Sequence, residues 1–166
     1  MSGVNSINWA RIICQIVYYF YAYFFLGKEK ISFSVPTGNF GDVYAGYVAK
    51  KMGLPIDKLI VATNENDILR RVINTGEYKP DEVKLSLSPS MDIQVSSNFE
   101  RLLFYILNKD DQKVGSLMKS LKDKGSFKLS DDEINEIKKD FKAEKISDSE
   151  TLSLIHISEP TRRTII

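Results

Sequence analysis

The chain has 166 residues, of which 43% are hydrophobic, and a formal net charge of +1 at pH 7. This length is enough for one domain with a buried core. The nearly neutral charge gives no indication of a nucleic-acid partner or an acidic surface partner. The single cysteine, Cys14, excludes an internal disulfide and fits a reducing compartment, so we expect a cytoplasmic protein.

The first predicted element is a helix over the apolar run 7–26, INWARIICQIVYYFYAYFFL, capped by Asn5 or Ser6 and ended at Gly27. Its length is close to that of a membrane span, but three polar side chains would then lie in hydrocarbon: Asn8, Arg11 and Gln15. We therefore expect a helix buried on most sides in a larger core, with no membrane partner. A membrane-anchored protein is the alternative.

The following segments alternate between strands and helices. Residues 31–35 and 59–62 are short, continuous apolar runs, which predict buried strands. Helices are expected at 41–52 and from Thr63 or Asn64 to about Ile73. Continuous apolar strands separated by helices are typical of a parallel sheet that is covered on both faces. The predicted fold class is therefore α/β, a partial three-layer αβα arrangement with a mainly parallel sheet.

The second half of the chain is more polar. A turn is expected at 73–80, and a Ser-rich loop at 86–98. Two helices should follow, one over 99–108 that is capped by Ser97 or Asn98, and an exposed one within 108–126. Ser130 with Glu133 three residues later predicts a capping box at the start of a last amphipathic helix.

The main candidate for a functional site is the corner Thr37–Asp42, TGNFGD, between the first strand and the second helix. In doubly wound sheets, ligands bind beyond the carboxyl ends of the strands, where this corner lies. The unpaired N–H groups and the dipole of a helix start favour an anion. Glycines at 38 and 41 let the main chain come close to a bound group.

The corner does not match the nucleotide fingerprints G-x-x-x-x-G-K-[ST] and G-x-G-x-x-G. The carboxylate of Asp42 suits the helix dipole but competes with a bound phosphate. From the residues alone, a phosphate site and a plain strand-to-helix turn are equally open.

Four segments resemble the bacterial and fungal type of threonine synthase: SINWARI, SVPTGNFGDVYAGYVAKKMGLP, LIVATNENDIL and SPSMDIQVSSNFERLLF. They occur in the family's order, and the likeness covers about residues 4–152. The resemblance implies a pyridoxal 5'-phosphate (PLP) enzyme of the tryptophan-synthase-β group, fold type II. It implies a lyase of threonine biosynthesis that converts O-phospho-L-homoserine and water to L-threonine and phosphate, with the cofactor ring as electron sink.

The resemblance places the cofactor beside the corner, at Thr37, Gly38, Asn39, Phe40, Gly41 and Asp42. Many relatives have asparagine where this chain has Asp42, which leaves its contact with the cofactor open. Ser96 belongs to a polar cluster that leads into the next helix, and the candidates for binding the substrate phosphate in this cluster are Ser97, Asn98 and Arg101.

Purely structural roles, without a ligand, are also open for several of these residues. Asn39 can close the turn with an Asx hydrogen bond, and Phe40 can be a core residue. The cluster around Ser97 can be an ordinary helix cap with a solvated Arg101. Arg11 and Gln15, spaced i, i+4 on one helix, more readily form a buried polar contact than a site.

The chain lacks the family's Schiff-base lysine motif around Phe-Lys-Asp, so we assign no catalytic residue to it, and no metal site. The family's C-terminal segment is also missing. Residues 1–152 are thus expected to be a partial catalytic domain, poorly soluble and inactive without the remainder of that domain. Residues 153–166, SLIHISEPTRRTII, resemble translated sequencing-adapter sequence and are expected to be a non-native tail, so His156 should carry no chemistry.

Two further functions are open beside a threonine synthase fragment. The chain can be a non-catalytic module that binds phosphate or PLP. It can also belong to another fold type II lyase, such as a serine/threonine dehydratase, although such enzymes usually have a corner richer in glycine than TGNFGD.

Overall fold

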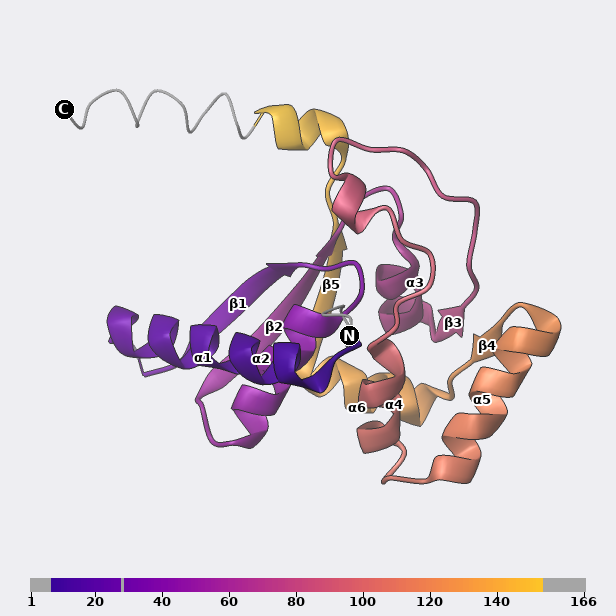
Figure 1. The fold of residues 1–166 in the computed structure, drawn as a ribbon, viewed down its shortest axis with the longest axis horizontal. Coiled ribbons are helices and arrows are strands. Elements are labelled where there is room, and N and C mark those ends of the chain that lie inside the picture. The colour runs from indigo at the N-terminus through magenta and orange to yellow at the C-terminus, as the bar shows by residue number, and fades with distance from the viewer. Residues whose placement is uncertain (1–6, 28, 154–166) are drawn as a thin grey trace, which may run out of the picture.

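The computed structural model describes residues 7–27 and 29–153, which form an α/β arrangement (Figure 1). The helices and strands, in chain order, are α1 (Trp9–Leu26), β1 (Ile31–Pro36), α2 (Gly41–Lys51), β2 (Ile56–Thr63), α3 (Ile68–Thr75), β3 (Glu77–Tyr78), the 3-10 turn η1 (Pro89–Met91), α4 (Phe99–Ile106), α5 (Asp111–Lys124), β4 (Phe127–Lys128), α6 (Asp131–Asp140) and β5 (Phe141–Lys145). Residues 148–153 are also helical. The predicted tail, apart from residue 153, lies outside the described residues.

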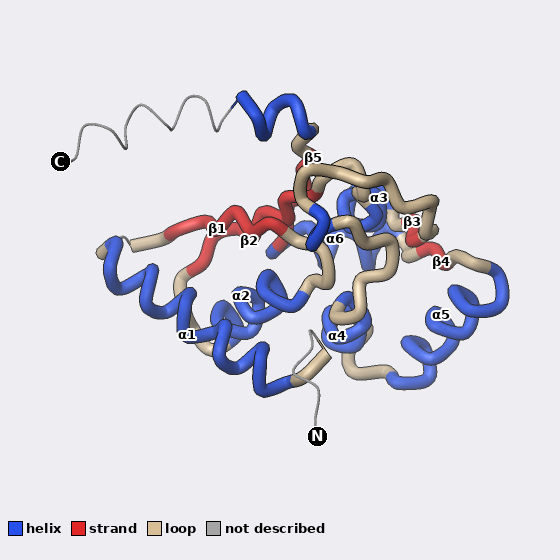
Figure 2. The backbone as a smooth tube through the Cα atoms, turned by 45° about the horizontal axis from the view of Figure 1, so that its top comes forward, coloured by secondary structure: helices blue, strands red, loops and turns tan. Residues whose placement is uncertain are grey.

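The main sheet has the strand order β1-β2-β5, and both pairs are parallel. When parallel strands follow one another in a single direction, right-handed crossovers place the connecting helices on the same face. Figure 2 shows α1 and α2 lying against one face of this sheet. Strands β3 and β4 form a separate antiparallel pair of two residues each. The α/β class with a mainly parallel sheet is therefore confirmed.

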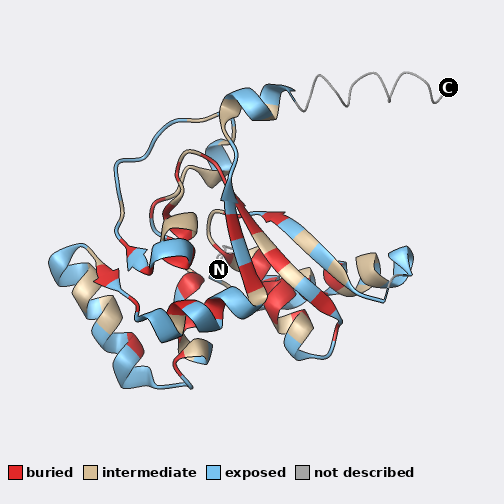
Figure 3. Cartoon of the chain, turned by 180° about the vertical axis from the view of Figure 1, so that it is seen from behind, coloured by how far each residue is buried: buried red, intermediate tan, exposed pale blue. Residues whose placement is uncertain are grey.

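Within the described residues, the helical cover of the sheet is one-sided. Figure 3 shows the opposite face with no helix across it. The outward residues of β1 are exposed on that face, namely Ser32, Ser34 and Pro36, whereas the inward Val35 is buried. The expected third layer would need a reversal of strand order, which the three strands described here do not contain.

The core lies between the covered sheet face and the helices. At Gly46 of α2, an added Cβ would lie 2.6 Å from the ring of Tyr19 on α1 and 2.8 Å from the side chain of Leu59 on β2. The absence of a side chain at Gly46 thus allows α2 to lie close to both α1 and the sheet.

Helix α1 is less buried than the sequence indicated. Only Ile12, Ile16 and Tyr19 are buried along it, whereas a row of large apolar side chains is exposed: Trp9, Ile13, Val17, Tyr18, Tyr21, Phe24, Phe25 and Leu26. The described residues therefore bury only one side of this helix, and its burial in a larger core stays a prediction. By length and composition alone, α1 also qualifies as a helix able to cross a membrane.

Several helix ends match the expectations and others differ. Helix α1 is capped by Asn8, whose side chain accepts from the N–H of Ala10, while the predicted caps Asn5 and Ser6 lie outside the described residues. Gly27 ends α1 in the left-handed conformation, and the capping box at Ser130 is confirmed.

The third helix begins later than predicted. It starts at Ile68 after Asp67, because Thr63 still pairs with Lys145 as the last residue of β2. The side chain of Asn64, the other predicted cap, instead donates to Ser86 and Asp92. The prediction of a cap at Thr63 or Asn64 is therefore wrong.

A candidate phosphate site at the end of the first strand

The predicted corner lies between β1 and α2 and borders a cavity of about 520 Å³. Residues Pro36–Asp42 line one side of it, and the other lining residues are Arg11 and Gln15 from α1 with Ser90 and Met91 from η1. The structure therefore brings all six predicted cofactor-binding residues, Thr37 to Asp42, to one cavity beyond the carboxyl end of β1.

Backbone N–H groups without partners gather at this corner. The N–H of Thr37 continues the sheet by donating to the carbonyl of Ala62 at 2.8 Å. In the described part of the chain, the next three N–H groups, of Gly38, Asn39 and Phe40, have no hydrogen-bond partner. The first turn of α2 adds N–H groups that lack an intrahelical acceptor. Such a row of donors at a helix start is suited to an anion.

Phe40 combines a strained backbone with a core side chain. Its φ of 63° lies in the left-handed region, which is unfavourable for a bulky residue. Its ring is buried and contacts Phe99 at 5.4 Å and Phe141 at 5.5 Å between ring centres. The ring therefore serves the core, as one interpretation of the sequence held, and this packing holds the backbone in the conformation that opens the corner.

Both hydrogen-bond donors of Thr37 are used within the protein. It is buried, and its hydroxyl donates to the carbonyl of Val35 at 2.6 Å. Its N–H is used by the sheet, so its free hydrogen-bonding capacity is the acceptor side of the hydroxyl. Among the predicted residues, the donors left for an anion are the main-chain N–H groups of residues 38–41 and the side-chain amide of Asn39.

Arg11 and Gln15 face this cavity, which sequence reasoning did not anticipate. The guanidinium of Arg11 is exposed, and the buried Oε1 of Gln15 has no partner among the described residues. An added Cβ on Gly41 would lie 3.8 Å from that Oε1. Their i, i+4 spacing was the available signal, but only the docking of α1 beside α2 brings them to the corner.

Asp42 is held by α1. The hydroxyl of Tyr19 donates to the Asp42 carbonyl at 2.9 Å and lies 3.3 Å from its carboxylate. Burial raises the pKa of Asp42, although the Tyr19 hydrogen bond and the charge of Arg11 act in the opposite direction. Burial also raises the pKa of Tyr19, so it stays a neutral donor.

The segment Ser96–Asn98 lies behind the corner. The hydroxyl of Ser96 donates to the carbonyl of Gly38 at 2.9 Å, and the side-chain amide of Asn98 donates to the carbonyl of Asn39 at 3.0 Å. Asn98 is fully buried. This pair therefore contacts the main chain of the corner from the side opposite the cavity lining.

The other predicted substrate residues lie away from the corner cavity. Arg101 donates to the carbonyl of Ile7 at 2.7 Å and to the side chain of Asn98 at 3.0 Å. With Ser97, it lines a different hollow of about 610 Å³ beside Trp9 and α5. A substrate role for Ser97, Asn98 and Arg101 stays a prediction.

A polar network fixes the loop that carries η1. Asp92 accepts from Asn64 at 2.7 Å, from Asn66 at 3.0 Å and from the hydroxyl of Ser86 at 2.6 Å. The hydrogen bond from Ser86 is the largest of the interactions that lower the pKa of Asp92. This network joins the end of β2 to the loop that lines the cavity.

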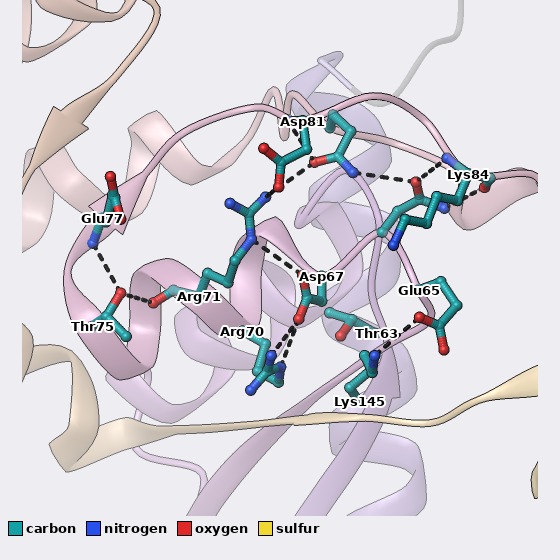
Figure 4. A network of polar contacts seen from close by, with 12 residues as sticks. Thr63, Glu65, Asp67, Arg70, Arg71, Thr75, Glu77, Asp81, Lys84 and Lys145 are labelled. Carbon is teal, nitrogen blue, oxygen red and sulfur yellow. Dashed lines mark hydrogen bonds and ion pairs between the residues drawn. The ribbon is translucent and has the colours of Figure 1, made fainter.

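A second network anchors the start of the same loop to α3 (Figure 4). Arg71 forms an ion pair with Asp67 at 3.2 Å on its own helix and with Asp81 at 3.0 Å on the loop. Figure 4 also shows Lys145 of β5 beside Glu65, at 3.0 Å. The polar side chains beyond the strand ends are thus largely used in holding loops.

No family model matches the chain. It is 50% identical over 169 residues to the threonine synthase of Saccharomyces cerevisiae and 51% identical over 155 residues to that of Pseudomonas aeruginosa, covering 93% and 92% of this chain but 33% of each relative. A solved structure described as PLP-bound threonine synthase from Brucella melitensis superposes with a TM-score of 0.88 and 55% identity, over 90% of this chain and 33% of that one. The chain thus spans about a third of the length of these relatives. By sequence and by fold, it is homologous to that third of the threonine synthases.

Proposed function

We propose that the chain forms the phosphate-binding part of a threonine synthase site and binds the phosphate of PLP at the corner Thr37–Asp42. The observation that carries this proposal is the row of N–H groups at the start of α2 that have no partner in the part of the chain that the structure describes, in a chain homologous to a PLP-bound threonine synthase. The phosphate would accept from the main chain of residues 38–41. The cofactor, when bound, supplies an electron sink for chemistry at the substrate amino acid.

The residues around the corner fit a phosphate-bearing group. The guanidinium of Arg11 supplies positive charge beside the N–H groups, and the carboxylate of Asp42 in the same lining offsets part of it. By contrast, a larger hollow of about 810 Å³ near α6 is lined by two lysines, Lys51 and Lys113, and by five carboxylates, those of Asp110, Asp132, Glu133, Glu136 and Asp140. Charge therefore favours the corner over that hollow for an anion.

The whole reaction that we propose is that of threonine synthase: O-phospho-L-homoserine and water give L-threonine and phosphate. This chain would hold the cofactor phosphate, and Ser97, Asn98 and Arg101 are proposed to act on the substrate side. No lysine lines the corner cavity among the described residues. The Schiff-base lysine is therefore proposed to come from the remainder of the fold, to which this chain would dock.

We further propose where the remainder docks and where the protein works. The exposed apolar row of α1 leaves much surface that water does not favour. If the other two thirds of a threonine synthase fold dock here, they would bury the exposed apolar row of α1. They would also add strands to the sheet beyond β1. We propose a cytoplasmic location for the assembled enzyme.

Binding measurements on the 166-residue chain test the cofactor proposal. Equilibrium dialysis should show binding of PLP and of inorganic phosphate, with pyridoxal, which lacks the phosphate, bound about tenfold more weakly or worse. Phosphate release from O-phospho-L-homoserine should stay at the no-protein level until the missing two thirds are supplied. Equal affinity for pyridoxal and PLP would contradict a phosphate-binding corner.

Two alternatives have specific observations in their favour. A non-catalytic phosphate-binding module fits the absence of lysine from the described cavity lining, and it predicts no turnover even after the remainder is supplied. A membrane-anchored protein fits the length and exposure of α1. Recovery of the chain only in the detergent fraction of a cell lysate, and not in inclusion bodies, would support the anchor.

A further inference from the structure

We propose that Ser96 and Asn98 are positioning residues that aim two main-chain N–H groups of the corner at a bound phosphate. This inference rests on the proposed function, because it assigns the phosphate to the same corner. Asn98 is fully buried, so its side chain would act on the corner through the main chain and not by contact with the ligand.

Two consecutive carbonyl groups of the corner are held by this pair. The Ser96 hydroxyl donates to the carbonyl of Gly38 at 2.9 Å. Asn98 donates twice to the carbonyl of Asn39, from its side-chain amide at 3.0 Å and from its backbone N–H at 3.1 Å. The two contacts join residues that are 58 and 59 positions apart in the chain.

The planar trans peptide turns these contacts into an orientation for the N–H groups. In each peptide unit, the C=O and the following N–H point in opposite directions. The carbonyls of Gly38 and Asn39 point toward Ser96 and Asn98, so the N–H groups of Asn39 and Phe40 point to the other side. The cavity borders residues 36–42 and is lined by none of residues 96–98. These two N–H groups have no partner among the described residues.

The positioning pair is itself fixed. The N–H of Ser96 donates to the hydroxyl of Tyr78 at 2.8 Å, and the Asn98 side-chain oxygen accepts from Arg101 at 3.0 Å. Tyr78 is buried and stacks on Phe99 and Phe127 with ring centres 5.7 and 4.8 Å apart. Donors held in advance need little rearrangement when the anion arrives, which favours binding.

The test compares Ser96→Ala and Asn98→Ala with the wild-type 166-residue chain. Each variant should bind inorganic phosphate and PLP about three- to tenfold more weakly, since each loses hydrogen bonds that orient a ligand donor. Affinity for pyridoxal should not change. Ser96→Thr, which keeps the hydroxyl, should restore phosphate affinity to within about twofold of wild type.

Ser120→Ala is the matched control. The Ser120 hydroxyl also donates to a main-chain carbonyl, that of Ser126 at 2.9 Å, but at α5 and outside the corner. This variant should lose thermal stability to a similar extent and keep its phosphate affinity. An equal loss of phosphate affinity in Ser120→Ala would overturn the inference, because general loosening of the fold would then explain the effect.

A measurement on the wild-type chain covers the case in which the alanine variants do not fold. In a phosphate titration followed by amide NMR, the signals of Asn39 and Phe40 should shift most. Shifts confined to Gly41 and Asp42 would overturn the positioning role and leave the phosphate site standing. Absence of any phosphate or PLP binding would overturn the proposed function, and the positioning inference with it.

Discussion

The Tyr19 hydroxyl donates to the backbone carbonyl of Asp42 at 2.9 Å, which ties the middle of α1 to the first turn of α2. The same hydroxyl lies 3.3 Å from the Asp42 carboxylate. A carboxylate is thereby held beside the N–H groups that we assign to a phosphate. Replacing it tests both its stability contribution and its effect on the anion.

We predict that Asp42→Asn stabilises the chain at neutral pH and tightens phosphate binding. Burial raises the pKa of Asp42 in the folded chain above the ordinary 3.8. A raised folded pKa means that the contribution of Asp42 to stability is full below the unfolded pKa and is lost as pH rises through the folded pKa. Removing the charge should also tighten phosphate binding by about two- to fivefold.

Thermal unfolding of wild type and of the Asp42→Asn variant at acid and neutral pH checks this prediction. The unfolding temperature of the variant should exceed that of wild type by little near pH 3 and by more as the pH rises toward 7. An equal stability difference at acid and at neutral pH would show that the charge of Asp42 does not cause the difference between the variant and wild type.

Gly46→Ala should destabilise the fold although alanine favours helices. The new Cβ would lie 2.6 Å from the Tyr19 ring and 2.8 Å from Leu59, so α1 or β2 must shift. Such overpacking costs about 1–3 kcal/mol. Gly115→Ala on α5 is the control, since nothing lies within 4 Å of its added Cβ, and it should gain about 0.5–1 kcal/mol. Urea unfolding of the two variants measures both values, and equal effects would refute the close contact at Gly46.

Asp92→Asn should weaken the fold at neutral pH and much less in acid. The pKa of Asp92 lies below the ordinary 3.8, with the hydrogen bond from Ser86 as its main cause. A depressed folded pKa contributes stability above the unfolded pKa, and this is lost as pH falls through the folded value. The measurement is the midpoint of thermal unfolding at pH 3 and pH 7. The exposed Asp123→Asn is the control for the loss of one negative charge, and a pH-independent loss in Asp92→Asn would contradict the role of its charge.

Replacing exposed aromatic residues of α1 should reduce self-association without unfolding the chain. Phe24 and Phe25 are 72% and 79% exposed, so Phe24→Ser with Phe25→Ser removes apolar surface that contacts water. Sedimentation velocity should show smaller species than in wild type. Ile12→Ala is the contrasting variant at a buried position of the same helix, and it should lower the free energy of unfolding by about 2–5 kcal/mol. Unchanged sedimentation of the double variant would show that this face does not drive association.

Features that depend on a few neighbouring residues were predictable from the sequence. The capping box joins Ser130 to Glu133, three positions apart, and the glycine end of α1 needs only Gly27 itself. The corner after β1 was found in the same way, because Pro36 limits the strand and a helix pattern follows at once. These signals arise from main-chain conformations that one or two side chains select.

Features that depend on pairing between distant segments were not predictable. β5, FKAEK, continues directly from the charged end of α6, and only its pairing with β2 makes it a strand. The same pairing carries β2 on to Thr63 and delays the start of α3. Burial of α1 also depended on which neighbours are present, and the described residues cover only its inner side.

The sequence by itself determined the corner TGNFGD, its position after a strand, and the likeness to threonine synthases. Only the tertiary structure decided what surrounds that corner. Arg11 and Gln15 reach it because α1 lies beside α2, and Ser96 and Asn98 reach its carbonyl groups across 58 and 59 positions of chain. The physical reason is that local main-chain preference creates N–H donors, whereas packing of distant segments fixes the direction in which those donors point.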